Sequence, residues 1–529
     1  MNRPGDGGEA GTPTGSGDEA GSGAAGLAGA GGDGSDMTGA GGGGATAPLG
    51  GADAGGATQG GADGELGGAG GSGGDATSPF HGLYVGPAGD DLDPGSEAEP
   101  FATLAHAASV AQAGDTIVFL DGTIQTTGAG VVIPAGVNLM AKNSGSATIL
   151  SQATAPSLLT IQGDTRIEGL KFSGHLTVAS FTGVGADPGL LTIADTQFIN
   201  CGVCVELKGT AKAAVTAPTN GALANGGTGF ANLNGTAELS VTGGTLQNSN
   251  GGSQFTVGGS AKLTVAGASF VDGTGSVANL SGEASATFDN VTVTTLANTM
   301  FLQGGTSQLT VTGSDVSMKP AVNPKYNCFS NTQNGVGSLT VKDSAVHDCG
   351  TGFKGSIPAT LTLDNVEVHH LDFGADLGVG ALGVGGAITI DGCDFHDFGH
   401  TAFRAGSGSN LNTFVFRDTT FSNNASSMWD MIILDASNAS TLDFGTLADP
   451  GGNTFLNANA AVSALRIAMT AGYVSAVGNT WAAAQGADGT GHYAASGTGA
   501  KLEITTDVAG GLNYVKPYAT TTLLLAQNP

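Results

Sequence analysis

Pairs of apolar residues five positions apart recur along most of this chain, and this spacing constrains the fold more than any other feature. The pairs are Ile193/Phe198, Val241/Leu246, Val265/Phe270, Phe288/Val293, Val311/Val316, Val341/Val346, Leu363/Val368, Ile390/Phe395 and Phe416/Phe421. From Val241 onward, successive first members lie 22 to 30 residues apart. A third apolar residue follows most pairs, and turns rich in Gly, Asn, Asp and Thr separate the three segments.

A strand-only repeat of about 20–30 residues is typical of a solenoid. We therefore predict an all-β fold, a right-handed parallel β-helix of about eleven coils with three short strands in each coil. Inward residues of one coil should stack on their equivalents in the next coil, about 4.8 Å away. A β-sandwich is the alternative, but it does not explain a constant spacing within the repeat beside a variable spacing between repeats.

The chain is expected to have four parts. Residues 1–78 are rich in Gly, Ala and Asp and contain no aromatic residue, so they are predicted to be a disordered linker. Residues 79–155 should form an N-terminal cap and the first coils, with a helix near residues 96–112 covering the open end of the stack. Residues 156–440 carry the repeats, and residues 441–529 should form the last coils and a C-terminal cap.

The charge balance excludes several classes of partner. The chain has 16 Lys and Arg against 44 Asp and Glu, a formal charge of -28. Nucleic acids and anionic membrane surfaces require a basic footprint, so neither is expected as a partner. No apolar run approaches the ~20 residues of a spanning helix. We expect a monomer.

The N-terminus bears on localisation. No apolar leader follows Met1, yet the Gly-rich tail is similar to the linkers that tether exported proteins to envelopes. We favour an extracellular or envelope-associated protein whose export signal lies outside this sequence. A cytoplasmic protein with a disordered tail is the alternative.

A segment near the start of the predicted fold resembles a known family. Residues 84–123 read YVGPAGDDLDPGSEAEPFATLAHAASVAQAGDTIVFLDGT, and VIPAGV follows at 132–137. This region, about 84–140, resembles the N-terminal signature of the domain-of-unknown-function 1565 group, which is found at the start of pectin-lyase-like β-helices. Polysaccharide lyases of the ninth family have a similar entry. The resemblance implies a right-handed β-helix, export and a carbohydrate setting.

Three histidines form the first candidate site. His347, His369 and His396 each follow the second apolar residue of a pair, in successive repeats. This position should face outward, so the rings should stack about 5 Å apart. Histidines beside carboxylates can bind Zn²⁺ or another transition metal or act as acid and base. A polar ladder on a solvent-facing surface is the alternative.

A second column contains basic residues. Lys354, Asp376 and Arg404 should align on one outward position, one residue after the third apolar segment. A lyase needs a base beside a group that neutralises a uronate carboxylate, and a hydrolase needs two carboxylates, for which Asp394 and Asp397 are the pair. Lys354, Arg404, Asp394 and Asp397 are therefore the candidate catalytic residues. A surface ion-pair ladder is the alternative.

The acidic turn near the start gives the third candidate. Asp90, Asp91 and Asp93 present oxygen ligands at closely spaced positions, which suits calcium as a cofactor. Ordinary turn chemistry explains the same residues.

Cysteine and threonine positions complete the candidates. Cys328, Cys349 and Cys393 should fall on neighbouring coils, where one disulfide bond can form, with buried free thiols as the alternative. Cys201 and Cys204 lack a second pair for a zinc knuckle. A column of threonines is predicted on one face, where it either fills a β-sheet surface or binds sugar. Its members are Thr192, Thr264, Thr310, Thr340, Thr362 and Thr389.

Two functional hypotheses follow. The first is an exported or surface-tethered β-helix that interacts with a polysaccharide or another envelope surface without catalysis. The second is a polysaccharide lyase or glycoside hydrolase acting on acidic glycans. Both use the outward residues of coils 340–425.

Overall fold

A computed structural model gives the fold, and the chain divides into two compact units, Met1–Asp75 and Ala76–Pro529. The predicted linker, residues 1–78, lies outside the described residues. The structure describes residues 82–126, 128–151, 156–174, 177–219, 221–247, 250–295, 298–319, 326–332, 337–356, 359–378, 386–405, 413–423, 428–429, 431–434, 440–446, 448–457, 465–467, 472–475, 478–483, 500–503, 515–517 and 523–525.

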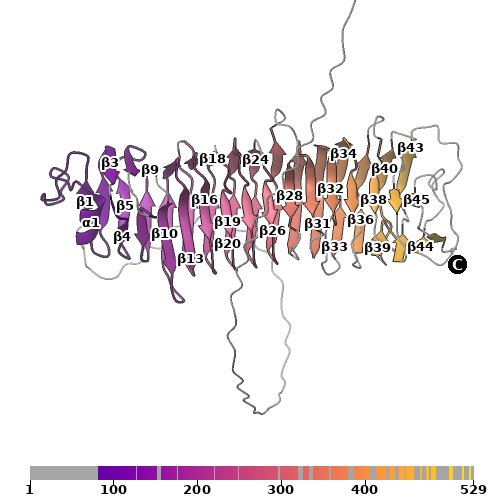
Figure 1. Ribbon diagram of the computed structural model, residues 1–529, viewed down its shortest axis with the longest axis horizontal. Helices are drawn as coiled ribbons and strands as arrows, with labels where there is room; N and C mark the ends of the chain where they lie inside the picture. The colour runs from indigo at the N-terminus through magenta and orange to yellow at the C-terminus, as the bar shows by residue number, and fades with distance from the viewer. Residues whose placement is uncertain are drawn as a thin grey trace, which may run out of the picture. The chain divides into compact units, whose positions relative to one another are not determined.

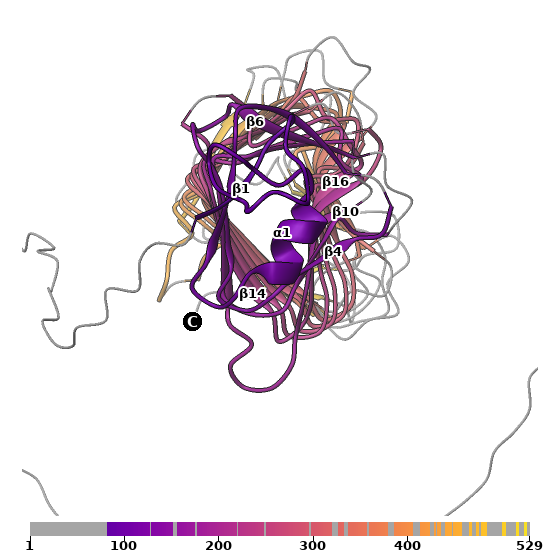
Figure 2. The ribbon, with the colours of Figure 1, turned by 90° about the vertical axis from the view of Figure 1, so that its left-hand side faces the viewer.

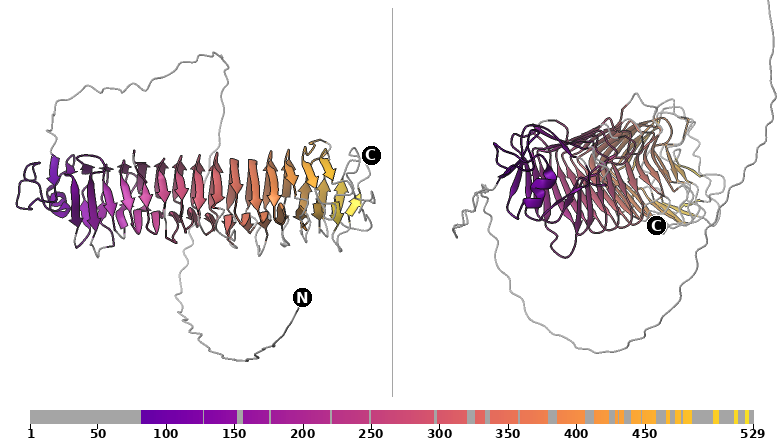
Figure 3. Two further views of the ribbon diagram at one scale, coloured as in Figure 1. Left: turned by 90° about the horizontal axis from the view of Figure 1, so that it is seen from above. Right: turned by 60° about the vertical axis from the view of Figure 1, so that its left-hand side comes forward.

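The second unit is a right-handed parallel β-helix, as predicted (Figure 1). Each coil contributes a first, a second and a third strand, and pairing with the next coil is parallel, which excludes the β-sandwich. Figure 3 shows the arrows of successive coils running the same way. First and second strands belong to a 31-stranded sheet and third strands to a 15-stranded sheet. Further coils lie at both ends of the repeats that the apolar pairs define.

The first strands are β1 (Gly82–Val85), β2 (Thr116–Phe119), β5 (Asn138–Ala141), β8 (Thr165–Glu168), β11 (Leu190–Ala194), β14 (Lys212–Thr216), β17 (Glu238–Thr242), β20 (Lys262–Ala266), β23 (Ser285–Asp289), β26 (Gln308–Thr312), β29 (Ser338–His347), β31 (Thr360–Leu371), β33 (Ala387–Asp391), β36 (Thr413–Arg417), β39 (Ser440–Asp443), β42 (Gly472–Ser475), β44 (Ala500–Glu503) and β46 (Leu523–Leu525). In β29 and β31 the first and second strands merge, which joins the two ladders into one sheet.

The remaining second strands are β3 (Gly122–Thr126), β6 (Ala147–Ser151), β9 (Lys171–Ser173), β12 (Gln197–Ile199), β15 (Ala224–Asn225), β18 (Thr245–Gln247), β21 (Ser269–Val271), β24 (Thr292–Thr295), β27 (Asp315–Met318), β34 (Asp394–Phe398), β37 (Thr420–Ser422), β40 (Thr454–Asn457) and β43 (Thr480–Ala483). The third strands are β4 (Val131–Ile133), β7 (Leu159–Ile161), β10 (Thr177–Gly183), β13 (Val203–Gly209), β16 (Gly229–Leu233), β19 (Phe255–Val257), β22 (Ala278–Leu280), β25 (Phe301–Gln303), β28 (Asn327–Asn331), β30 (Thr351–Gly355), β32 (Phe373–Leu377), β35 (Phe403–Ala405), β38 (Ile432–Leu434), β41 (Leu465–Ile467) and β45 (Val515–Pro517).

The core consists of vertical columns of inward side chains. Val341 pairs with Leu363, which pairs with Ile390, and all three are fully buried. Rings stack in the same way: Phe301, Phe329 and Phe353 have centroids 5.0 Å apart and nearly parallel planes. Such pairs contribute about 0.5–1.5 kcal/mol each beyond the area they bury. The apolar spacing therefore becomes a continuous core along the stack.

A one-residue turn explains the constant spacing of five. Between Val341 and Val346 the chain reverses its facing at Asp343, which has a φ of 48°. Asn365 and Asp418 occupy the same left-handed position in their coils. Asn, Asp and Gly tolerate this conformation at least cost, so a short polar residue or glycine recurs there and the two strands keep a fixed offset.

In many coils the residue after this turn is polar, and these residues form what we call the turn ladder, which Val366 interrupts between its second and third members. Its members are Ser314, Ser344, Cys393, Thr419, Asn453 and Asn479. At most steps the side-chain oxygen accepts a hydrogen bond from the backbone N–H of the equivalent residue one coil earlier, as Ser344 does from Ser314 (3.1 Å) and Asn453 from Thr419 (3.1 Å). Buried backbone groups need partners, and the turn ladder supplies them where the strands are interrupted.

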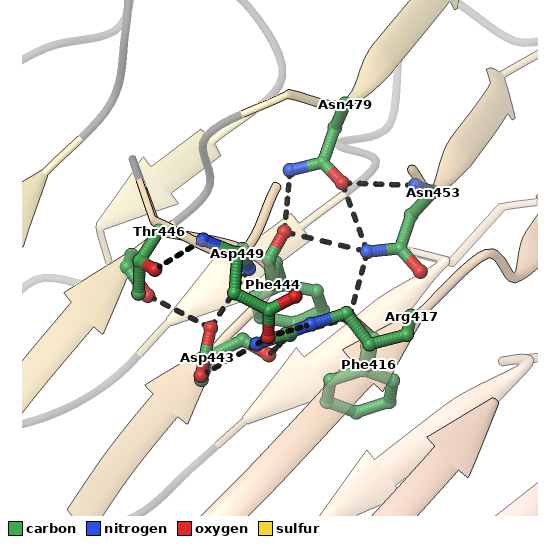
Figure 4. A network of polar contacts seen from close by, with 10 residues as sticks. Phe416, Arg417, Asp443, Phe444, Thr446, Asp449, Asn453 and Asn479 are labelled. Atoms are coloured by element: carbon green, nitrogen blue, oxygen red, sulfur yellow. Dashed lines mark hydrogen bonds and ion pairs between the residues drawn. The ribbon is translucent and has the colours of Figure 1, made fainter. Parts of the chain in front are cut away.

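Figure 4 shows the last two members of the turn ladder. Asn453 Nδ2 donates to the Phe416 carbonyl (3.0 Å), and Asn479 Nδ2 donates to the Phe444 carbonyl (2.7 Å). Beside them, Arg417 Nη2 donates to Asp443 (2.8 Å) and Asp449 (2.7 Å). This end of the described stack is thus held by buried amides and a paired guanidinium.

The helix α1 (Leu104–Val110) lies across the N-terminal end of the stack (Figure 2). It is shorter than the predicted 96–112. Residues before it form turns instead, because Asp91 accepts hydrogen bonds from the backbone and hydroxyl of Thr103, and Thr103 in turn caps the helix by accepting from the His106 N–H (3.1 Å). Among the described residues no helix is long and apolar enough to cross a bilayer.

Candidate functional site

The histidine column forms as predicted. His347, His369 and His396 occupy one register position on β29, β31 and β34. Their ring centroids lie 4.8 and 5.0 Å apart, with interplanar angles of 8° and 1°. The column faces outward because the preceding residues, such as Val346, fill the core.

Carboxylates hold the two outer rings of this column. His347 contacts Asp348 (Nδ1–Oδ2, 2.7 Å) and Asp315 (Nε2–Oδ1, 2.9 Å). His396 contacts Asp397 through Nδ1 (2.9 Å) and Glu367 through Nε2 (3.2 Å).

The residue after each histidine is left-handed. Asp348, His370 and Asp397 have φ values of 57°, 53° and 56°, which turn their side chains back toward the preceding ring. In the middle coil a second imidazole takes the carboxylate's place, so His369 and His370 meet through their Nδ1 atoms (2.8 Å), one donating and the other accepting.

The pKa values of His369 and His396 shift in opposite directions. Burial, followed by the nearby His347, lowers the pKa of His369. Burial also acts to lower the pKa of His396, but the hydrogen bonds to Asp397 and Glu367 outweigh it, so this pKa is raised. The hydrogen bond from His396 lowers the pKa of Asp397. His396 therefore holds a proton more readily than its neighbour His369.

The ring stacking bears on the metal hypothesis for His347, His369 and His396. Imidazole lone pairs lie in the ring plane, so parallel rings do not direct them at a common point. Within the described ranges, no three His, Cys, Asp or Glu side chains are arranged to hold a metal ion. A metal role for these histidines stays a prediction.

The second predicted column also forms, and we call it the cation column: Lys354, Asp376 and Arg404 on β30, β32 and β35. Asp376 is 8% exposed, and its Oδ1 has no hydrogen-bond partner in the part of the chain that the structure describes. Arg404 Nε lies 3.7 Å from that atom, too far for a good hydrogen bond. A buried carboxylate thus lies between two outward cations without being fully satisfied.

The cation column continues in register toward the C-terminal end. Ile433 follows Arg404, and Arg466 and Lys516 occupy the next two positions. Toward the N-terminus, the same register holds no basic residue. Its members among the described strands there are Val132, Thr160, Ser180, Glu206, Asn232, Thr256, Asn279, Leu302 and Ser330.

A small cavity lies beside Lys354, under the ends of β28 and β30. Its volume of about 10 Å³ is the room that one water needs. Asn331 and Ser356 line it, and the side-chain polar atoms of both are buried without a protein partner among the described residues. The amide and hydroxyl are therefore available to a water or to a polar ligand group.

The four candidate catalytic residues separate into two groups. Lys354 and Arg404 lie on the 15-stranded sheet, whereas Asp394 and Asp397 lie on β34 of the other sheet. Asp394 is exposed and Asp397 is engaged with His396. The carboxylate pair and the cation column therefore belong to different faces.

The acidic turn uses two of its three carboxylates internally. Asp90 accepts from the Leu92 N–H (3.0 Å), and Asp91 accepts from Thr103 (2.8 and 2.9 Å). Asp93 is partly exposed at the same turn. These contacts are those of an ordinary polar turn, and calcium binding at this turn stays a prediction.

The cysteines divide as the sequence allowed. Cys328 and Cys349 form a disulfide bond, and Cys393 is a buried free thiol whose pKa burial raises to about 12. Cys201 and Cys204 are also buried, and burial, then the hydrogen bond with Cys201, raises the pKa of Cys204. In the threonine column, Thr310, Thr340, Thr362 and Thr389 are consecutive neighbours.

Sequence reasoning missed the turn ladder and the left-handed turns that position it. The signal was present as Asn, Asp or Gly followed by a small polar residue between the two apolar members of a pair, as in Asp343–Ser344 and Asp418–Thr419. From the sequence alone, these residues are typical of an ordinary turn.

Comparisons with known proteins find solved structures alone. No protein-family model matches the chain, and no curated protein matches it in sequence. The catalytic unit of an alpha-1,3-glucanase from Streptomyces thermodiastaticus is 16% identical over 66% of this chain, with a TM-score of 0.41, and the chain spans 64% of that unit, less than two thirds of it. A pectate lyase is 15% identical over 67% of this chain and 78% of its own, with a TM-score of 0.29. A mannuronan C-5 epimerase module from Azotobacter vinelandii is 11% identical over 80% of this chain and 94% of its own, with a TM-score of 0.25.

Proposed function

We propose that the protein is an exported, surface-tethered polysaccharide-binding protein and that the cation column binds an acidic glycan. The observation that carries the proposal is the pair of outward cations, Lys354 and Arg404, in one register of the sheet. Arg404 Nε lies 3.7 Å from the buried Asp376, too far for a good hydrogen bond.

The geometry suits a repeating anion. Lys354 and Arg404 are two coils apart, which is about 10 Å at ~4.8 Å per coil. The register continues to Arg466 and Lys516, so basic positions recur along one line of the sheet. A polymer carrying a carboxylate on successive sugars presents charges with a similar repeat, whereas a small anion would engage one cation.

The overall charge makes this line of cations notable. The chain has 16 basic residues, and its net charge of -28 repels anions at long range. Four of the basic residues occupy this single register. Screening at physiological salt restricts the repulsion to about 8 Å, so the local cations decide what binds at short range.

The disulfide bond between Cys328 and Cys349 supports export, because such bonds persist in oxidising compartments. The predicted linker at 1–78 would then tether the β-helix to the envelope.

Binding is tested with polygalacturonate and alginate against their carboxyl-reduced, uncharged forms, by titration calorimetry. We expect the charged polymers to bind and the Lys354→Ala, Arg404→Ala double variant to lose most of the affinity. Lys262→Ala is the matched control, because Lys262 is an exposed lysine on a first strand, 67% exposed and close to Glu238. Equal binding of charged and uncharged polymers, or equal loss in the control, would contradict the proposal.

The same samples test the enzymatic alternative. An ultraviolet-absorbing unsaturated product, or new reducing ends, after incubation of the charged polymers with the protein would overturn binding without turnover. Loss of that activity in Arg404→Ala would then assign it to the cation column, and its loss in Asp394→Asn would assign it to the histidine face.

A further inference from the structure

An exposed aromatic strip lies where the chain turns from the second strands into the 15-stranded sheet. Tyr326, Gly350, Asp372 and His400 are successive rungs of this corner, joined by backbone hydrogen bonds of 2.7, 3.1 and 2.8 Å. Trp429 follows on the next coil, where its ring contacts that of His400. The corner therefore forms one line parallel to the columns already described.

Rings on this corner stack on one another. Phe373 and His400 have centroids 4.9 Å apart and planes within 4° of each other. The Trp429 ring lies 5.1 Å from His400, tilted by 47°. Trp429 is 45% exposed and Tyr326 is 41% exposed. We call these four rings the aromatic strip: Tyr326, Phe373, His400 and Trp429.

Among the side chains that the structure describes, Tyr326 and Trp429 are the large aromatic ones that are exposed. The largest fully buried side chains are all phenylalanines, which fill the core. Large exposed apolar side chains otherwise occur singly, and single ones need no explanation. At this corner the Trp429 ring meets that of His400, which stacks on Phe373, and partly exposed aromatic side chains are typical of recognition surfaces.

The aromatic strip and the cation column share strands. Phe373 precedes Asp376 by three residues, and His400 precedes Arg404 by four. At about 3.3 Å per residue, the two lines are about 10–13 Å apart along the strands. That distance exceeds the size of one sugar ring, and it matches a short oligosaccharide lying along the strand direction.

We propose that the aromatic strip is a stacking subsite for uncharged sugar faces of the same glycan, with Trp429 as its main contact. This inference rests on the proposed glycan binding at the cation column. The apolar C–H face of a pyranose packs on an aromatic ring, while the acidic sugars of the chain reach Lys354 and Arg404. The glycan then runs parallel to the solenoid axis along the cation column, and a part of it that crosses the strands by about 10–13 Å, along β32 and β35, reaches the aromatic strip.

The test uses Trp429 as its own reporter. The chain has two tryptophans, so in a Trp481→Phe background the emission comes from Trp429 alone. We expect polygalacturonate, alginate and their carboxyl-reduced forms to shift this emission to shorter wavelength, because a sugar face would replace water on the indole. The reduced polymers should bind weakly enough to require high concentrations.

Variants separate ring stacking from general apolar contact. Trp429→Ala should weaken binding of charged polymers about tenfold, whereas Trp429→Phe should retain most of it. Met428→Ala is the matched control, because Met428 is the adjacent residue and is 83% exposed. Equal loss in Met428→Ala would indicate docking of an apolar partner and overturn the inference, as would unchanged binding in Trp429→Ala.

The two proposals fail in different ways. If the Lys354→Ala, Arg404→Ala variant still shifts Trp429 emission with the reduced polymers, the aromatic strip is a sugar subsite whatever the cations do. If charged polymers bind through the cations without any change in Trp429 emission, the aromatic-strip inference is wrong and the proposed function stands. No emission change with any of these polymers overturns the inference.

Discussion

The histidine column and the cation column lie on the same coils and are built by the same register, yet the protein treats their charges differently. Each outer histidine contacts two carboxylates, as His396 does with Asp397 and Glu367. In the cation column, Asp376 keeps an oxygen without a hydrogen-bond partner among the described residues, and Arg404 remains 3.7 Å away.

This difference separates a structural ladder from a binding surface. Groups that already have partners gain little from a ligand, because binding would exchange one hydrogen bond for another. Arg404 gains more from an anionic ligand, because its Nε lies 3.7 Å from Asp376, too far for a good hydrogen bond. We therefore assign ligand binding to the cation column and mutual support to the histidines.

The largest effect on stability is expected where a polar column is buried and fully paired, as in the turn ladder (Figure 4). Asn453 is fully buried, accepts from Thr419, and donates to Phe416 and to Asn479. Asn453→Ala should lower the free energy of unfolding by about 3 kcal/mol, because several buried groups lose partners. Urea unfolding measures it, with the exposed Asn143→Ala as control. A loss below about 1 kcal/mol would contradict this account of polar satisfaction.

Charge reversal in the cation column should give the largest effect on binding. Replacing Lys354 and Arg404 with Glu removes two charge-assisted contacts at about 1.5 kcal/mol each, so affinity for acidic glycans should fall roughly 100-fold. The His347→Ala, His396→Ala variant should bind within about twofold of the original protein. Calorimetric titration of both variants checks the comparison directly, and a larger loss in the histidine variant would reverse the assignment.

Much of the fold could be predicted from the sequence, because two separate features of the repeat fix which residues of neighbouring coils pair. Inward residues such as Val341 and Leu363 fix which positions face the core, and the left-handed turn at Asp343 or Asn365 fixes the offset between strands. The positions of the two candidate columns follow from these constraints alone. The alignment of both columns is therefore confirmed by the register of the strands.

The sequence does not predict which polar groups of these two columns find hydrogen-bond partners. Whether Asp376 is paired depends on Arg404 lying 3.7 Å away instead of within hydrogen-bonding distance. Likewise, the separation of Asp394 from Arg404 depends on the angle between two sheets. The aromatic strip was missed because turns into the third strands vary in length, so Trp429 and His400 show no fixed spacing from the apolar pairs.

Removing the charge of Asp376 should raise the affinity for acidic glycans, by a smaller factor than charge reversal of the cations lowers it. In Asp376→Asn the two cations lose the internal anion that competes with a ligand, so acidic glycans should bind about three- to tenfold more tightly. The fold should change in stability by no more than about 1 kcal/mol, because the lost attraction to Arg404 is offset by the lower desolvation of a neutral amide. Weaker binding in this variant would mean that Asp376 contacts the ligand itself.

The smallest expected effect is the pH dependence of the histidine column. The pKa of His396 is raised above 6.5, so its contribution to stability is complete below pH 6.5 and is lost as the pH rises through the folded-state pKa. The pKa of His369 is lowered below 6.5, so its contribution is present above pH 6.5 and is lost as the pH falls through the folded-state pKa. The two contributions oppose each other.

Single substitutions should therefore reveal a pH dependence of the unfolding free energy that the two opposing contributions reduce in the original protein. His396→Gln should make the protein relatively less stable on the acid side of pH 6.5, and His369→Gln should make it relatively more stable there, each by a few tenths to about 1 kcal/mol, as for partly exposed pairs. Urea unfolding at pH 5.5 and 7.5 measures the slopes, and NMR titration of the imidazole C–H signals should place His396 above His369. Identical titration of both rings would show that the carboxylate contacts do not separate the two pKa values. The contrast between the histidine column and the cation column would then lose its basis.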